Sequence, residues 1–199
     1  MTWWATIDGL VLPKQLAGHP ALELVNTRSG WGQPFHEKQE YLKTFDHLAV
    51  LARANGLLSE RTTSRLRRRA ASEPEAAAAV LDQARRMRTD LHDVLLDQGS
   101  RAAGQRVATA VTDARARQRL DLGAQPGWSF PGDPSLDDAL DSFLVAAADL
   151  LVARPRIGAC PGHDCGWLFL NTSGRRRWCQ MAVCGNRAKQ AAHARRTTH

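Results

Sequence analysis

Four cysteines lie close together near the end of the 199-residue chain. Cys160 and Cys165 form one C-x4-C pair, Cys179 and Cys184 form another, and thirteen residues separate the pairs. Zinc binds thiolates readily, and two local pairs are an economical way to present four of them tetrahedrally. Each loop is longer than in the sharper C-x2-C pattern, so free or redox-active cysteines are the alternative. We predict a structural zinc site, because four thiolates leave no open position for a catalytic water.

All of the net positive charge lies in the same segment as the cysteines. Residues 154–199 contain nine lysines and arginines against Asp164 alone, whereas residues 1–153 contain 18 basic and 19 acidic residues. Some arginines would offset the net charge of −2 on a zinc ion with four thiolates. The remaining basic residues favour phosphate contacts with DNA, although an RNA or a protein partner would also suit them. The predicted nucleic-acid contacts are Arg175, Arg176, Arg177, Asn186, Arg187, Lys189, Arg195 and Arg196.

The sequence around the cysteines predicts a treble-clef-like finger. Residues 167–170 form an apolar strand, residues 171–174 favour a turn, and residues 175–178 are expected to return as the second strand of a β-hairpin. From Gly185 onward the sequence favours a helix, which places Cys184 at the positive end of the helix dipole. A core this small needs the metal to supply folding free energy.

The first 153 residues predict a helical bundle with little sheet. Five segments are predicted to be helices. These segments are residues 39–55, 59–69, 72–99, 105–120 and 136–153. Apolar residues recur at three- and four-residue steps in the first, third and fifth, the second is an arginine-rich stretch after a plausible Ser59 N-cap, and the fourth is helical by composition with a thin apolar stripe. Ser72 and Glu75 have the spacing of a capping box that would open the longest helix. A turn-rich loop at 126–134 is expected to lay Trp128 and Phe130 against the helices. We therefore predict a mainly α protein, with a helical domain at 1–153 and a zinc finger at 154–199.

The helical part offers few residues for chemistry. It contains no Gly-rich phosphate loop, nucleophile elbow or metal-binding His-Glu pair, so we expect no enzyme. Asn26 and Thr27 follow an apolar run and are candidates to line a ligand site, with a structural turn or cap as the alternative. No apolar run approaches the roughly 20 residues of a membrane span. Residues 1–12 lack the features of a secretory signal, which predicts a cytoplasmic location.

Both parts of the chain resemble known bacterial families. The tail, CGWLFLNTS followed by RRRWCQMAVCGNRAKQAAHARR, resembles the CGNR zinc finger, with Cys184 to Arg187 as its signature tetrapeptide. The body, from PALELVNTR through LARANGLLSE to AADLLVA, resembles the ABATE domain that normally precedes this finger. The resemblance implies a stress-induced transcription regulator whose four cysteines hold zinc and whose finger binds DNA. Residues 173–178 form a stretch about two residues shorter than the family pattern, which predicts a tighter turn. The contact surface would be altered if the residues missing here contact DNA in the family.

Two functions from different classes fit the sequence. The first is a zinc-dependent, DNA-binding transcription regulator whose helical domain senses a small-molecule effector or forms a homodimer. The second is a small-molecule-binding or protein-interaction helical protein whose zinc finger is purely structural. The second is motivated by the 153 residues of helical body that carry no basic excess. A deep pocket lined by Asn26, Thr27 and an aromatic residue such as Trp31 or Trp128 would favour ligand binding.

Overall fold

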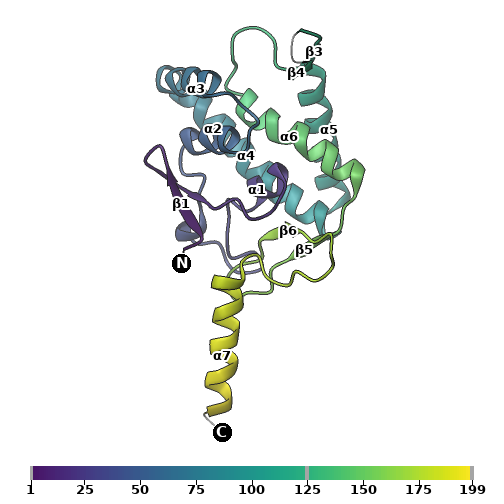
Figure 1. The fold of residues 1–199 in the computed structure, drawn as a ribbon. Helices are drawn as coiled ribbons and strands as arrows, with labels where there is room; N and C mark the ends of the chain where they lie inside the picture. The colour runs from purple at the N-terminus through teal and green to yellow at the C-terminus, as the bar shows by residue number, and fades with distance from the viewer. Residues whose placement is uncertain (1, 124–125, 198–199) are drawn as a thin grey trace. The chain divides into compact units, whose positions relative to one another are not determined.

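The structure is a computed structural model that describes residues 2–123 and 126–197. Its ribbon is mainly helical, with short β-hairpins, as the sequence predicts (Figure 1). The chain divides into two compact units, which we call the finger unit (Met1–Tyr41 with Arg154–His199) and the helical unit (Leu42–Ala153). The first 41 residues therefore share a unit with the cysteines, whereas the sequence predicted them to belong with the helices.

The helical unit is built from five helices and one small hairpin. The helices are α2 (Phe45–Ala54), α3 (Glu60–Ser72), α4 (Pro74–Leu95), α5 (Arg101–Arg117) and α6 (Asp138–Ala153). The hairpin pairs β3 (Arg119–Asp121) with β4 (Gly127–Ser129) in antiparallel register, with Leu120 opposite Trp128. The core lies between α2, α4 and α6, where Leu48, Leu91 and Phe143 are fully buried. Each of these residues belongs to the apolar stripe from which its helix was predicted.

Three predicted helix starts are wrong. The helix predicted from residue 105 begins at Arg101, because the Ser100 hydroxyl caps it and accepts from the Ala103 N–H at 3.1 Å. The helix predicted from residue 39 begins at Phe45, because the backbone N–H of Tyr41 donates to the Thr27 carbonyl and so holds an extended segment. The predicted Ser72 cap does not form. Ser72 is the last residue of α3, and its hydroxyl donates back to the Arg69 carbonyl at 2.9 Å. Pro74 opens α4, which is the longest helix, as predicted.

The loop predicted at 126–134 has a partly different structure. Gly127–Ser129 is extended, but it pairs with β3 in a hairpin and leaves Trp128 57% exposed. Most of this side chain is therefore not packed against the helices, unlike the prediction. The Arg115 guanidinium lies 6.0 Å from the centre of the Trp128 ring.

The finger unit consists of short elements from both ends of the chain. They are β1 (Trp4–Ile7), β2 (Leu10–Pro13), α1 (Pro20–Val25), the 3-10 turn η1 (Glu37–Gln39), β5 (Ile157–Ala159), β6 (Leu168–Leu170), the π-helical turn η2 (Met181–Gly185) and α7 (Asn186–Thr197). β1 pairs with β2, and β5 pairs with β6, both in antiparallel register. Cys160 directly follows β5 and Cys165 lies shortly before β6, so the loop of this hairpin carries the first cysteine pair.

The predicted partner strand for β6 is wrong. Residues 175–178 form no strand, because β6 already has β5 on one edge and the N-terminal segment on the other. The N–H of Leu170 donates to the Ala17 carbonyl at 2.8 Å. The Asn171 side chain closes the following turn, since its oxygen accepts from the Arg176 N–H and its amide donates to the Arg176 carbonyl, both at 3.0 Å.

One asparagine side chain continues the edge of β6 as a strand would. Asn26, at the end of α1, is 1% exposed. Its Nδ2 donates to the Leu168 carbonyl at 2.9 Å, and its Oδ1 accepts from the Leu168 N–H at 2.8 Å. These two bonds join residues that are 142 positions apart in the chain. An amide side chain has the donor and acceptor of a peptide group, so it can satisfy a strand edge from outside.

Among the helices of residues 2–123 and 126–197, none has the length and apolarity needed to cross a membrane.

Replacing Asn26 should destabilise the finger unit strongly. Asn26→Ala leaves a buried N–H and a buried carbonyl of Leu168 without partners, so we expect a decrease of about 2–4 kcal/mol in the free energy of unfolding. Urea unfolding of the metal-loaded protein measures this decrease. The matched control is Asn55→Ala at the end of α2, which removes one partly buried bond to the Leu51 carbonyl, with an expected cost of about 1 kcal/mol. Equal destabilisation of both variants would contradict the role of Asn26 at the strand edge.

Candidate metal centre

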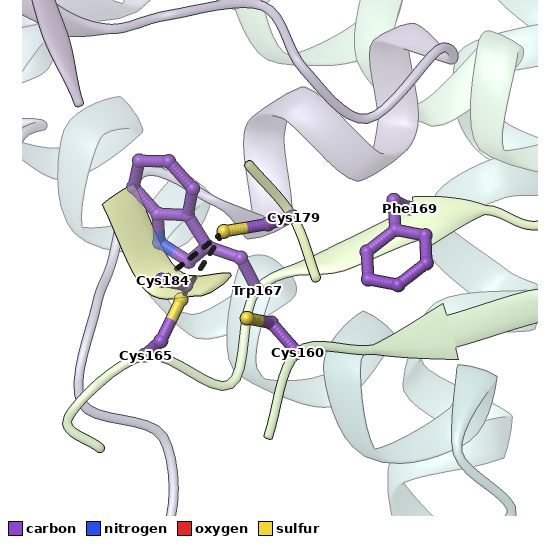
Figure 2. Packing of buried hydrophobic residues seen from close by; sticks show 6 residues of the cluster. All are labelled: Cys160, Cys165, Trp167, Phe169, Cys179 and Cys184. Atoms are coloured by element: carbon purple, nitrogen blue, oxygen red, sulfur yellow. Dashed lines mark hydrogen bonds between the residues drawn. The ribbon is translucent and has the colours of Figure 1, made fainter. Parts of the chain in front are cut away.

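The four cysteines predicted as ligands come together in one buried cluster. The sulfur atoms of Cys160, Cys165, Cys179 and Cys184 all lie within 4.8 Å of one another. The Cys165 and Cys184 sulfurs are each 3.6 Å from that of Cys179, and Figure 2 shows the sulfurs turned toward one another. A tetrahedral ion with bonds of about 2.3 Å to sulfur places its ligands about 3.8 Å apart. The cluster therefore fits a metal ion held by four thiolates.

Backbone hydrogen bonds hold the two cysteine pairs in place. The N–H of Cys160 donates to the Trp167 carbonyl at 2.8 Å, and that of Cys184 donates to the Gln180 carbonyl at 3.0 Å. Gly162 lies inside the first loop, where an added Cβ would stand 3.0 Å from the Cys184 sulfur. A larger residue at this position would press on a ligand atom, so the glycine is required by the close approach of the two loops.

The thiols influence one another's ionisation. Hydrogen bonds from the Cys165 thiol and its neighbours lower the pKa of Cys160. The bond to Cys160 in turn raises the pKa of the Cys165 thiol, because that proton is shared with an anionic sulfur. A bound cation would be needed to ionise all four, and its binding would release protons.

Aromatic side chains from both ends of the chain surround the metal centre. Trp167 and Phe169 are buried beside the sulfurs, and further partly buried side chains pack against them. These are Trp3, Leu16, Trp31, Tyr41 and Trp178. The indole N–H of Trp167 donates to the Arg28 carbonyl at 2.8 Å, and the Tyr41 ring meets it edge-on at 6.3 Å. The N-terminal 41 residues therefore supply one side of the shell around the cluster.

The N-terminal loop also binds the first cysteine loop directly. The N–H of Gly30 donates to the Asp164 carbonyl at 3.0 Å, and the N–H of Trp31 donates to the Cys165 carbonyl at 3.3 Å. Sequence reasoning did not connect these residues with the cysteines. The signal was present in the distribution of tryptophan, since five of the six lie in residues 1–41 and 154–199.

Comparison with known families agrees with this arrangement. Residues 18–154 match the ABATE family, described as "Putative stress-induced transcription regulator", and residues 156–197 match the CGNR zinc finger. The chain belongs to the ABATE family. No curated protein matches it. The ABATE match begins at residue 18, inside the finger unit. Residues from both matched segments therefore surround the four cysteines.

Arg176 of this ABATE protein has a structural position that the sequence did not indicate. Its Nη2 donates to the Leu16 carbonyl at 2.6 Å and also to the Cys179 carbonyl, and its Nε donates to the Trp178 carbonyl at 3.2 Å. The guanidinium lies 4.3 Å from the centre of the Phe169 ring. These contacts tie the N-terminal segment to the cysteine loops. Arg176 therefore differs from the other predicted nucleic-acid contacts, because its Nε and Nη2 donors already bind backbone carbonyls inside the protein.

The other predicted nucleic-acid contacts are exposed. They are Arg175, Arg177, Asn186, Arg187, Lys189, Arg195 and Arg196. The Arg187 guanidinium stacks 4.2 Å from the centre of the Trp3 ring, and that of Arg177 lies 5.3 Å from the Trp178 ring. No residue from Asn186 to Arg196 in α7 is buried, and this helix has no acidic residue. The finger unit holds 12 basic and 5 acidic residues, whereas the helical unit holds 15 of each.

Asn26 and Thr27, the candidate ligand-binding residues, have structural contacts. The two Leu168 bonds use the Asn26 amide. The Thr27 hydroxyl donates to the Leu24 carbonyl at 2.6 Å, and its side chain is fully buried. These contacts favour the structural alternative that the sequence left open.

A buried carboxylate lies beside the Arg176 contacts. Glu23 of α1 is 3% exposed, and its Oε1 accepts from the Ala17 N–H at 2.7 Å. Its Oε2 is buried and has no hydrogen-bond partner among the described residues. Burial raises the pKa of the Glu23 carboxyl from 4.5 to about 7, against the opposing effect of backbone donors and of Arg176.

The Glu23 carboxyl should make stability depend on pH. The unfolded chain loses this proton near pH 4.5 and the folded chain near pH 7, so the stabilisation present at low pH disappears as pH rises through this window. The change amounts to about 3 kcal/mol. Unfolding of the wild type and Glu23→Gln, compared at each pH between 5 and 8, isolates this effect from metal release. Parallel curves for the two proteins would refute the raised pKa.

The cluster should bind one metal ion through all four sulfurs. Titration of the reduced protein with Co²⁺ should give the absorption of a tetrahedral ion with thiolate ligands, saturating at one ion per chain. Cys184→Ser removes one ligand, so we expect weaker binding and a lower charge-transfer intensity. Met181→Ala is the control, because Met181 is an exposed residue of η2 and its replacement leaves all four cysteines in place. An unchanged spectrum in the Cys184 variant would contradict a site with four cysteine ligands.

Proposed function

We propose that this ABATE-family protein is a DNA-binding transcription regulator with a structural zinc ion, and not an enzyme. The observation that carries the proposal is α7, a basic helix that begins directly after the cysteine-bearing turn η2 and has no buried residue between Asn186 and Arg196. Four thiolates favour zinc, and they close its coordination shell, so the ion supplies folding free energy rather than a reactive water. The CGNR match supports this choice of metal.

The composition of α7 favours a polyanionic partner. A helix that lacks large apolar residues gains little from burial against its own protein. Arg187, Lys189, Arg195 and Arg196 extend along it without an acidic residue between them. Phosphates attract such a helix, and each contact releases a condensed counterion from the nucleic acid. In the proposed complex, α7 and the exposed Arg175 and Arg177 contact the DNA together.

Two of the proposed contact residues are already oriented. Arg187 stacks on Trp3, and Arg177 lies over Trp178. Stacking restricts the rotamers of a long side chain, so the entropic cost is smaller when the guanidinium meets a phosphate or a guanine edge. Arg176 contributes indirectly in this proposal, by holding the turn that presents its two neighbours.

The DNA-binding proposal predicts a steep dependence on salt. Anisotropy of a labelled random-sequence duplex, titrated with zinc-loaded protein, should give an affinity that falls linearly on a double logarithmic plot against salt concentration. Arg195→Gln with Arg196→Gln should weaken binding and reduce the slope by about 0.9 for each phosphate that the variant no longer neutralises. Arg86→Gln is the matched control, because Arg86 is an exposed arginine of the helical unit.

The same titration separates the alternatives. Stoichiometric zinc without affinity for any duplex would overturn the DNA-binding proposal and leave a purely structural finger. A clear preference for an RNA duplex of the same sequence would assign the basic surface to RNA instead. Binding that Arg86→Gln weakens as much as the α7 variants would show a general charge effect and no specific role for α7.

We also propose that the helical unit senses a small-molecule effector. Its equal numbers of basic and acidic residues give it no net positive charge to attract nucleic acid. Its surface, in contrast, contains a sizeable hollow beside the exposed Trp128.

A further inference from the structure

A cavity of about 480 Å³ lies within the helical unit. One wall is α6, which contributes Asp138, Ser142, Val145 and Asp149. These positions follow at steps of four, three and four residues, so they share one face of the helix. The loop between α2 and α3 forms a second wall, and residues 128–134, from β4 onward, form the third. Small-molecule sites in proteins have volumes of roughly 300–1,000 Å³.

Exposed apolar side chains gather on the β3–β4 hairpin, which borders the cavity through Trp128 and Ser129. Trp128 lines the cavity and is 57% exposed. Its cross-strand partner Leu120 is 51% exposed, and Leu122 on the same hairpin is 76% exposed. Single exposed apolar residues are ordinary, but three of them on one hairpin, one of which lines the cavity, indicate a contact surface. Arg115 lies over the Trp128 ring and pairs with Asp149, so the ring is oriented at the cavity rim.

The charged residues that line the cavity are already paired. Asp149 binds Arg115 at 2.7 Å, Asp138 binds Arg117, and Arg65 binds Asp133. A charged ligand would have to break one of these pairs or give up hydration without gaining an opposite charge. Uncharged hydroxyl and amide groups also line the walls, at Ser59, Thr62 and Gln118. The lining therefore favours a ligand that stacks and forms hydrogen bonds but carries no net charge.

We propose that this cavity binds an uncharged, planar aromatic compound whose ring packs against Trp128 and Phe130. Hydrogen bonds from the hydroxyl and amide groups of the walls would orient the polar edge of the ligand. This proposal specifies the effector of the sensing role proposed above. It rests on the proposed function only in the assumption that the bound ligand alters DNA binding. The binding itself depends on residues of the helical unit alone.

Two dyes that differ by one charged group test the proposal. N-phenyl-1-naphthylamine is uncharged, and 8-anilino-1-naphthalenesulfonate carries the same rings with a sulfonate. Titrated into the zinc-loaded full chain without DNA, the uncharged dye should bind one site per chain and at least about tenfold more tightly than the sulfonate. Trp128→Ala should weaken its binding about tenfold, as expected when an aromatic ring no longer packs against the ligand, and Trp128→Phe should restore most of it.

A matched control uses a tryptophan of the other unit. Trp4 of β1 is 42% exposed, so Trp4→Ala removes a similarly exposed ring and should leave dye binding unchanged. Equal binding of the dye by the wild type and the Trp128→Ala variant would overturn the site. Tighter binding of the sulfonate would overturn the prediction of an uncharged ligand. Saturable, Trp128-dependent binding of the uncharged dye by a protein without DNA affinity would support the cavity and reject only the DNA-binding proposal.

Discussion

The clustering of four sulfur atoms within 4.8 Å is the constraint on which the finger unit depends. Four thiolates at this distance repel one another, and the surrounding aromatic residues exclude water that could screen them. Only a cation at their centre makes all four anionic at neutral pH. The short strands, the glycine of the first loop and the hydrogen bonds of η2 all serve to bring these sulfurs together.

The cluster is also the place where the two ends of the chain meet. Asn26 completes the edge of β6, Arg176 binds the Leu16 carbonyl, and Trp31 donates to the first cysteine loop. Each contact satisfies a polar group that the finger cannot satisfy by itself. The finger is therefore not an independent appendage, because its shell requires residues from the first 41 positions. A change near the N-terminus can thus alter the surroundings of the metal centre.

The two units differ in chemistry as well as in structure. The finger unit concentrates the positive charge and the metal ligands, whereas the helical unit balances its charges and pairs many of them. Excess charge in one unit supports long-range attraction to a polyanion. Paired charges around a hollow favour a neutral ligand, since the charged groups that line it already have partners. This division fits a regulator in which one unit contacts DNA and the other receives a signal.

The sequence by itself determined the local features of this protein. The cysteine spacing identified the candidate ligand set, the charge asymmetry identified the basic tail, and apolar periodicity identified α2, α4 and α6. Tertiary structure decided how β6 is paired and where α2 begins. It also decided that Arg176 binds backbone carbonyls of its own protein. These features depend on hydrogen bonds between residues as far apart as Asn26 and Leu168, which no local pattern records. Side-chain amides can replace a strand, and only the packed chain shows which donor reaches which carbonyl.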